Sequence, residues 1–179
     1  MNIPNILTLG RLCLVPLVIL MIQQGEWTAA FALFVIAGLT DGIDGFFARQ
    51  FDQRTELGAY LDPLADKALL VSIYVTLAIG GVIPSWLTIL VVSRDVMIMG
   101  AVIVSWLLDN PVRIRPLYVS KANTFAQIAL AALVLGARAF GLDLGRGVMV
   151  MAIVVGCLTL ASTAAYLAFW LRHMAGGDD

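Results

Sequence analysis

Residues 41–67 read DGIDGFFARQFDQRTELGAYLDPLADK, and this stretch carries four aspartates: Asp41, Asp44, Asp62 and Asp66. On an α-helix, at about 100° per residue, Asp41 and Asp44 lie within about 60° of each other. Asp62 and Asp66 are spaced i, i+4 and also share one helix face. If the chain folds back at the connecting residues 50–55, antiparallel helices bring both pairs to the same two depths. We therefore expect four carboxylates to converge on one small volume.

Outside this stretch the chain is mostly apolar. Of its 179 residues 61% are hydrophobic and 13% charged, and the mean hydropathy is +0.95, whereas soluble domains are about half apolar and a quarter charged. These values indicate an all-α integral membrane protein, and we expect a single membrane-embedded domain over residues 1–179. The net charge of −1 gives no footprint for nucleic acid. Two widely spaced cysteines predict neither a disulfide framework nor a zinc site.

Breaks at glycine, proline and charged residues divide the chain into about six apolar segments, each near the length of about 20 residues that a transmembrane helix needs. We therefore predict six transmembrane helices with short connections, so that neighbours run antiparallel in the lipid bilayer. The predicted spans are residues 6–22, 27–48, 57–79, 84–108, 119–137 and 147–171. Within them, Gly100 and Gly156 are expected to be helix-packing contacts.

The distribution of Lys and Arg predicts the orientation, since short cytoplasmic loops are enriched in both. One face of the predicted bundle collects Arg49, Arg54, Arg113, Arg115 and Arg172, with Lys121 close by, and the other has Arg138 and Arg146. We expect both termini and the aspartate stretch on the cytoplasmic side of a multi-pass protein. The start of the chain shows no transit-like leader, which favours the plasma (inner) membrane of a bacterium.

The negative charge of four carboxylates at the edge of a bilayer must be neutralised. An isolated carboxylate in a span costs about 2.5–3.5 kcal/mol, and neighbouring like charges repel each other. Protonation would neutralise them, and so would two divalent cations, for which oxygen-only ligands favour Mg²⁺ or Mn²⁺. We favour the cations, because a metal pair is suited to hold a diphosphate and to stabilise phosphoryl transfer.

Small residues and one arginine accompany the aspartates. Gly45 and Gly58 remove side chains from the carboxylate faces, where a ligand or a partner helix must approach closely. Arg49 lies about one turn from the carboxylates and can bind a phosphate oxygen. Asp52, in the connection, is instead expected to be a solvated or capping residue.

The spacing of these residues resembles the signature of the CDP-alcohol phosphotransferases, D-x₂-D-G-x₂-A-R-x₈-G-x₃-D-x₃-D. All eight positions match with every spacer of the right length: Asp41, Asp44, Gly45, Ala48, Arg49, Gly58, Asp62 and Asp66. The six predicted spans agree with the fold of that family, so the resemblance covers essentially the whole chain. It implies that an acceptor hydroxyl attacks the diphosphate of a CDP-linked donor, usually CDP-diacylglycerol, with release of CMP.

The resemblance also implies roles for individual residues. The metal ligands would be Asp41, Asp44, Asp62 and Asp66. Asp66 would in addition act as the catalytic general base on the acceptor hydroxyl. The donor CDP-lipid would contact Gly45, Ala48, Arg49 and Gly58, and the family-like opening NIPNILTLGR adds Asn5, Thr8 and Arg11 as candidates. Members of the family commonly form homodimers, so we expect a homodimer here.

Two further stretches concern the acceptor. VSRDVMI places Arg94 and Asp95 near the middle of a predicted span, where ionisable residues are usually functional. RIRPLYVSKANTFAQ adds Arg113, Arg115 and Lys121 at the cytoplasmic edge. Basic residues beside a metal site suggest an acceptor that carries a phosphate, a phosphate-bearing glycerol, and we take these four cations as its candidate ligands. The alternative is a structural Arg94–Asp95 contact together with ordinary cytoplasmic loop charges.

The same stretches, SRDVMI and RPLYVSKANT, resemble the cardiolipin synthases of this family, in which S-R-D and S-K-x-N-T elements recur. Phosphatidylglycerophosphate synthases tend instead to an R-E element and a G-K-x-K-T-like element. Asn123 here stands where a second lysine would be. One cation fewer fits a singly charged phosphodiester better than a phosphomonoester. The resemblance therefore favours phosphatidylglycerol as acceptor, with glycerol 3-phosphate as the alternative.

An ion-coupled transporter is the alternative from outside enzymology, because pumps also use intramembrane carboxylates. Such a pathway needs carboxylates distributed across the bilayer, whereas here all four cluster toward one side. The two halves of the sequence also lack the matching pair of broken helices that an inverted-repeat transporter would suggest. We therefore expect an enzyme.

Overall fold

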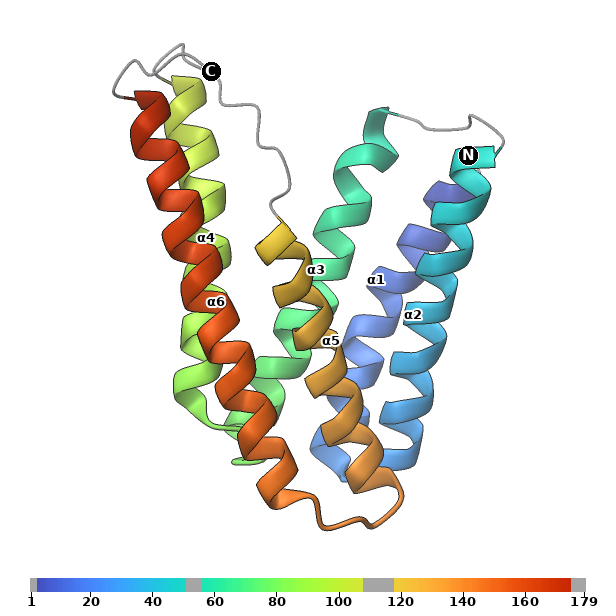
Figure 1. Ribbon diagram of the computed structural model, residues 1–179. Coiled ribbons are helices and arrows are strands. Elements are labelled where there is room, and N and C mark those ends of the chain that lie inside the picture. Colours follow the sequence, from blue (N-terminus) through green and yellow to red (C-terminus); the bar gives the residue numbers. More distant parts are fainter. Residues whose placement is uncertain (1–2, 51–55, 108–117, 175–179) are drawn as a thin grey trace.

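The computed structural model describes residues 3–50, 56–107 and 118–174; within these ranges it leaves undescribed the side chains of residues 3–9, 11, 41–50, 56–66 and 106. Six α-helices make up this part of the chain (Figure 1). They are α1 (Ile3–Gln24), α2 (Trp27–Gln50), α3 (Glu56–Ile79), α4 (Ser85–Leu107), α5 (Tyr118–Ala139) and α6 (Gly145–Met174). The prediction of six helices is confirmed, and the predicted segments end within three residues of the observed helix ends.

The connections at one end of the bundle are short because glycine allows a sharp reversal (Figure 1). Gly25, Gly81 and Gly141 follow α1, α3 and α5 with φ of 77°, 67° and 65°, a region that strains other residues. After each glycine, the next residue donates its N–H to the carbonyl five positions earlier, at 2.8–2.9 Å. This pattern closes the last turn of each helix. The three antiparallel reversals therefore follow from local sequence.

The surface of the bundle is typical of a protein surrounded by lipid. Three helical stretches are long and apolar enough to cross a membrane: Ser85–Ser105, Tyr118–Ala139 and Gly145–Met174. Shorter apolar stretches occur in the other helices, within the part searched, at Leu12–Gln24, Trp27–Thr40 and Lys67–Ile79. Large apolar side chains point outward, with Leu39, Ile79 and Ile89 exposed by 62%, 84% and 65%. The chain is therefore a membrane protein, and the crossing of the bilayer by all six helices stays a prediction.

The helices surround a core built from residues of all six. Helix α1 packs against α2 and α3, α5 packs against α2, α3 and α6, and α4 packs against α3 and α6. Almost fully buried members of this core include Val18, Ala37, Ile73, Leu77, Leu87, Val91, Leu130, Val134, Leu135 and Val155. Because α1 and α5 each contact both α2 and α3, these two helices are fixed at a defined separation.

Helices α2 and α3 run antiparallel, as the sequence predicts (Figure 1). In the described residues, however, they do not pack directly against each other; α1 and α5 lie against both. Helices α1 and α5 supply the apolar contacts that hold α2 and α3 in this antiparallel arrangement within the described residues.

The packing of α4 against α6 depends on Gly156. A Cβ atom at this position would lie 2.8 Å from Cζ3 and 3.1 Å from Cη2 of the Trp86 indole. At Gly100, by contrast, no described atom lies within 4 Å of the added Cβ. The expected packing role therefore applies to Gly156, whereas Gly100 has no such contact in the described part of the chain.

We expect Gly156→Leu to lower the free energy of unfolding by about 1–3 kcal/mol, because the larger side chain forces Trp86 and the two helices apart. The midpoint of thermal unfolding in a single detergent measures the effect. Gly100→Leu is the matched control and should leave that midpoint close to the wild-type value. Equal losses in both variants would mean that the closeness of α4 and α6 is not what Gly156 provides.

Candidate active site

The four aspartates lie on the two helices that face each other across the bundle. Asp41 and Asp44 belong to the last three turns of α2, and Asp62 and Asp66 to the first three turns of α3. Because the helices are antiparallel, both pairs lie at the same end of the bundle (Figure 1). The backbone placement agrees with the sequence prediction. The side chains of these residues lie outside those described, so the convergence of the carboxylates stays a prediction.

The other candidate residues for the donor lie on the same helices or on α1. Gly45, Ala48 and Arg49 belong to α2, Gly58 to α3, and Asn5, Thr8 and Arg11 to α1. The positions of their side chains are likewise outside the description, and Arg113 and Arg115 lie outside the described residues altogether. Among the residues searched, no three Asp, Glu, Cys or His side chains gather to hold a metal ion; the predicted ligands were not among them.

A cavity of about 290 Å³ opens beside the aspartate-bearing ends of both helices. It begins within one turn of them, since Gly38 precedes Asp41 by three residues and Lys67 directly follows Asp66. Its walls come from α2, α3, α4 and α5, with polar side chains of Lys67, Arg94, Asp95, Thr124 and Gln127 and apolar side chains of Phe34, Ala37, Leu69, Leu70, Val71, Val91 and Ile128. A ligand here would therefore meet both charged groups and an apolar wall.

Five polar side chains from four helices form one connected group at this cavity, which we call the polar clamp: Lys67, Arg94, Asp95, Ser120 and Ser162. The carboxylate Oδ1 of Asp95 lies 2.6 Å from Nη1 of Arg94 and 3.1 Å from Nζ of Lys67. The Nη2 of Arg94 donates to the hydroxyl of Ser120 and, at 2.9 Å, to that of Ser162. The clamp therefore ties α3, α4, α5 and α6 together at one level.

Arg94 is held by its neighbours rather than presented to solvent. It is 6% exposed, and its guanidinium carbon lies 5.6 Å from the centre of the Tyr166 ring, a cation–π distance. Its two terminal nitrogens are engaged in the polar clamp, and Nε has no partner among the described residues. The structural Arg94–Asp95 contact considered from the sequence is therefore present. Direct contact of Arg94 with an acceptor stays a proposal.

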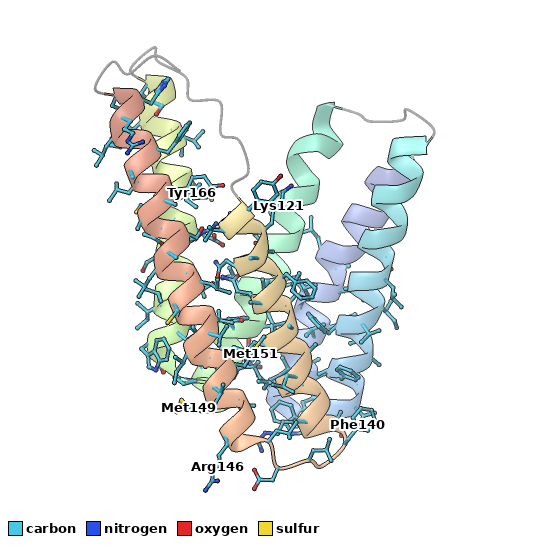
Figure 2. All side chains as sticks on the ribbon, in the orientation of Figure 1. Lys121, Phe140, Arg146, Met149, Met151 and Tyr166 are labelled. Carbon is cyan, nitrogen blue, oxygen red and sulfur yellow. The ribbon has the colours of Figure 1, made fainter. Side chains whose placement is uncertain are left out.

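Lys121 has a different environment. It lies at the start of α5, at the end of the bundle that carries the aspartates (Figure 2), and its side chain is exposed. Its ammonium nitrogen lies 5.8 Å from the centre of the Tyr118 ring, and Tyr118 itself is 89% exposed. Lys121 is therefore an accessible cation at this end of the bundle, outside the residues that line the cavity.

Below the polar clamp, α5 presents two buried amides toward the centre of the bundle. The hydroxyl of Thr159 donates to Oδ1 of Asn123 at 2.9 Å, and the hydroxyl of Tyr74 donates to the carbonyl oxygen of Gln127 at 3.0 Å. Asn123 is 0% and Gln127 3% exposed, yet Nδ2 and Nε2 find no partner among the described residues. Because a buried donor without a partner is destabilising, an oxygen-bearing ligand would be favoured at Gln127, which lines the cavity.

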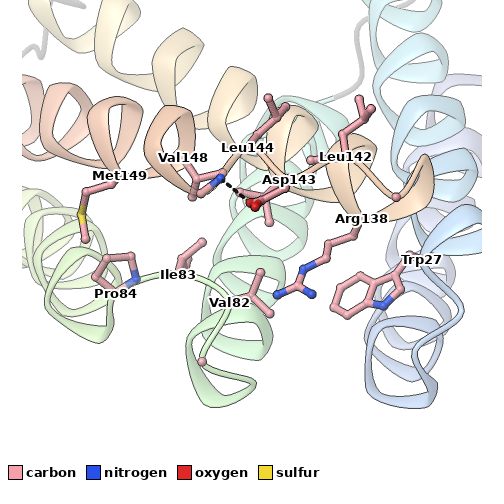
Figure 3. Close-up of a pocket in the computed structure, with 15 residues that line it drawn as sticks. Trp27, Val82, Ile83, Pro84, Arg138, Leu142, Asp143, Leu144, Val148 and Met149 are labelled. Atoms are coloured by element: carbon pink, nitrogen blue, oxygen red, sulfur yellow. Dashed lines mark hydrogen bonds between the residues drawn. The ribbon is translucent and has the colours of Figure 1, made fainter.

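A larger cavity, of about 650 Å³, lies at the opposite end of the bundle (Figure 3). There the guanidinium of Arg138 lies 5.5 Å from the centre of the Trp27 ring, and Oδ1 of Asp143 accepts the N–H of Gly145 at 3.2 Å. These groups are satisfied locally, and the aspartate stretch lies at the other end of α2 and α3. Size alone does not identify a catalytic site, so the smaller cavity beside the aspartates is the candidate.

Four residues of the polar clamp were not assigned from the sequence alone: Lys67, Asp95, Ser120 and Ser162. In the sequence, Asp95 is a charged residue inside a predicted transmembrane span, which is often functional. Lys67 is a charged residue that directly follows the predicted general base, Asp66. Their pairing could not be read from spacing, because they lie 28 positions apart on different helices.

The sequence is similar to a known protein family and to several of its members. The sequence profile of the CDP-alcohol phosphatidyltransferases matches residues 1–172. Human cardiolipin synthase (CMP-forming) is 38% identical over 155 residues, covering 78% of this chain and 52% of the human protein. A probable phosphatidylglycerophosphate synthase of Mycobacterium tuberculosis is 33% identical over 185 residues, covering 98% of this chain and 84% of that protein. This chain spans about half the length of the human, rat and Drosophila cardiolipin synthases that it matches.

Proposed function

This chain belongs to the CDP-alcohol phosphatidyltransferase family, and we propose that it moves the phosphatidyl group of CDP-diacylglycerol to a hydroxyl of phosphatidylglycerol, giving cardiolipin and CMP. The observation that carries the donor chemistry is the complete spacing from Asp41 to Asp66, which lies on the two helices α2 and α3. Residues 1–179 would form a single membrane-embedded domain. A homodimer in a bacterial plasma membrane, with the reaction on the cytoplasmic side, completes the proposal.

The donor set suits divalent cations. Four carboxylates offer oxygen ligands only, which fits Mg²⁺ or Mn²⁺ better than zinc or copper, and Asp41, Asp44, Asp62 and Asp66 would hold two such ions. Bound there, the cations would neutralise the diphosphate of the donor. Arg49 would neutralise a further phosphate oxygen, and Gly45, Ala48 and Gly58 would allow the cytidine to approach the backbone.

Asp66 would perform the proton transfer. Its carboxylate accepts the proton of the acceptor hydroxyl, whose oxygen forms a bond to the phosphorus that carries the diacylglycerol. The bond between that phosphorus and the oxygen bridging to CMP breaks, and CMP leaves. The apolar surroundings below the site would limit access of water, which would otherwise compete with the acceptor.

Two features support a lipid acceptor that carries a phosphodiester. The S-R-D and S-K-x-N-T elements resemble those of the cardiolipin synthases and make exposed Lys121 a candidate ligand of the acceptor phosphate, with Arg94, Arg113 and Arg115 as further candidates. The cavity beside the aspartates combines cationic and apolar walls, which suits the head group and the upper acyl chains of a lipid. Free glycerol 3-phosphate has no acyl chain that could contact the apolar wall of the cavity.

Synthesis of phosphatidylglycerophosphate from glycerol 3-phosphate is the second candidate. It is favoured by the length of the alignment with the probable phosphatidylglycerophosphate synthase of M. tuberculosis, which covers 84% of that protein. A CDP-diacylglycerol–glycerol-3-phosphate 3-phosphatidyltransferase of Bacillus subtilis, 33% identical over 150 residues, points the same way. The two candidates share donor, cations and general base and differ in the acceptor alone.

An acceptor competition separates them. The purified full chain would receive CDP-diacylglycerol, Mn²⁺ and equal concentrations of phosphatidylglycerol and glycerol 3-phosphate, with product lipids identified by mass. We expect cardiolipin as the main product, with CMP released in equal amount. A preference for phosphatidylglycerophosphate would replace the first candidate by the second. Absence of CMP with either acceptor, tested separately with Mg²⁺ and Mn²⁺, would contradict both.

A further inference from the structure

We propose that the ion pair between Lys67 and Asp95 is a positioning device for the reaction: it fixes the rotation of the first turns of α3 and thereby the direction of Asp66. This inference rests on the proposed function, since it assigns a role to residues beside the general base. Neither Lys67 nor Asp95 is a position of the aspartate signature. Their role follows from the contacts of the polar clamp.

The clamp connects α3 to a rigid anchor. Lys67 extends from α3 to Asp95 on α4, with 3.1 Å between Nζ and Oδ1. The same carboxylate oxygen is held at 2.6 Å by Arg94, whose guanidinium is fixed by Ser120 of α5 and Ser162 of α6. The side chains of Asp95 and Arg94 are 14% and 6% exposed and therefore largely buried, whereas the Lys67 side chain is 40% exposed. Lys67 therefore connects α3 to the buried pair of Arg94 and Asp95 on α4.

Rotation of α3 matters because Asp66 directly precedes Lys67. Side-chain atoms lie about 5–6 Å from a helix axis, so a rotation of about 20° would move a carboxylate by about 2 Å. Metal–ligand distances tolerate only about 0.2 Å. A small change in helix rotation would therefore remove Asp66, and with it Asp62 on the same face, from working geometry.

A second polar contact holds α3 lower in the bundle. Tyr74 stands seven residues after Lys67, on nearly the same helix face, about 10 Å further along the axis. Its hydroxyl donates to the Gln127 carbonyl at 3.0 Å, and its own carbonyl accepts from Thr88 at 3.2 Å, both in buried surroundings. Loss of Lys67 would leave this lower contact intact. The fold should therefore survive while the upper turns of α3 lose their fixed rotation.

The test uses Lys67→Met in the full chain, with Lys67→Arg as the variant that retains the ion pair. We expect Lys67→Met to lower kcat about tenfold and to raise the dissociation constant for Mn²⁺ by a similar factor, as is usual when a residue that orients a metal ligand is lost. Mn²⁺ binding would be followed directly from the electron paramagnetic resonance signal of the free ion. KM for CDP-diacylglycerol and the melting midpoint should stay near wild type, and Lys67→Arg should recover most of kcat.

Arg146→Met is the matched control, because it removes an exposed cation at the opposite end of the bundle (Figure 2). It should leave kcat and Mn²⁺ affinity unchanged. Asp95→Asn removes the same ion pair from its other side and should lower kcat at least as much as Lys67→Met, with a lower melting midpoint because Arg94 also loses its carboxylate partner. Adding Lys67→Met to Asp95→Asn should cause little further loss of kcat.

The outcomes separate the inference from the function on which it rests. Wild-type kcat and Mn²⁺ affinity in Lys67→Met would overturn the positioning role while leaving the proposed reaction intact. Equal losses in Lys67→Met and Lys67→Arg would also overturn it, because they would show that a cation able to pair with Asp95 is not enough to preserve turnover. Lack of CMP release by the wild-type chain with both acceptors would instead reject the proposed function.

Discussion

Asp66→Asn is expected to lower turnover about 1,000-fold or more, within the range for loss of a general base that is also a metal ligand. Asparagine has nearly the shape of aspartate, but its amide cannot accept the proton of the acceptor hydroxyl. CDP-diacylglycerol binding should be largely retained, because Asp41, Asp44 and Arg49 remain on α2. The initial rate of CMP release measures turnover, and binding is measured separately with the unreacted donor.

Asp52→Asn is the control for this result. Asp52 lies in the same acidic stretch but at no position of the signature, so its replacement should leave CMP release close to the wild-type rate. If Asp66→Asn kept substantial activity, the base would have to be another residue. If instead it lost donor binding together with turnover, Asp66 would act mainly as a metal ligand.

Arg94→Met is expected to produce the largest loss of stability, about 3 kcal/mol, because removal of one member of a buried ion pair leaves its partners without compensation. Asp95 would keep only Lys67, and the hydroxyls of Ser120 and Ser162 would lose their shared donor. For a chain of this size the loss corresponds to a decrease in the melting midpoint of about 6–12 °C. Thermal unfolding in a single detergent would measure it.

Arg138→Met is the matched control for Arg94→Met. Arg138 is an exposed cation that also lies over an aromatic ring, that of Trp27, at 5.5 Å. Its loss should lower stability by at most about 1 kcal/mol, the size of an exposed cation–π contact. A direct acceptor role for Arg94 predicts a different pattern: a raised KM for the acceptor with an unchanged melting midpoint. That pattern would contradict the structural role of the clamp.

The helices could be predicted closely from sequence because the signals are local. Apolar runs of sufficient length, interrupted by glycine, proline and charge, mark each helix, and Gly25, Gly81 and Gly141 end three of them with positive φ. These preferences depend on a few neighbouring residues, so no knowledge of packing is needed. The distance between α2 and α3 could not be predicted in this way. The sequence predicts that the two helices are antiparallel, but their separation depends on contacts that α1 and α5 make with both.

Some residues of the candidate site could likewise be recognised from the sequence, whereas others could not. The aspartate signature lies within 26 residues, so its helical periodicity and its set of oxygen ligands could be read from the sequence. The family was suggested by resemblance to a known signature and is shown by the match over residues 1–172. Arg94 was likewise recognisable as a charge inside a span. Its neighbours were not, because Ser120 and Ser162 are unremarkable in sequence and become partners of Arg94 only when α5 and α6 pack beside α4.

Periodicity and composition were therefore enough to predict a helical membrane protein with regularly spaced aspartates at one end, since both depend on residues close together in the chain. The cavity beside those carboxylates, the buried environment of Arg94 and the link from Lys67 to Asp95 arose from contacts between residues distant in sequence. Such contacts are selected by the packing of whole helices, and many arrangements of these helices would satisfy the same local pattern.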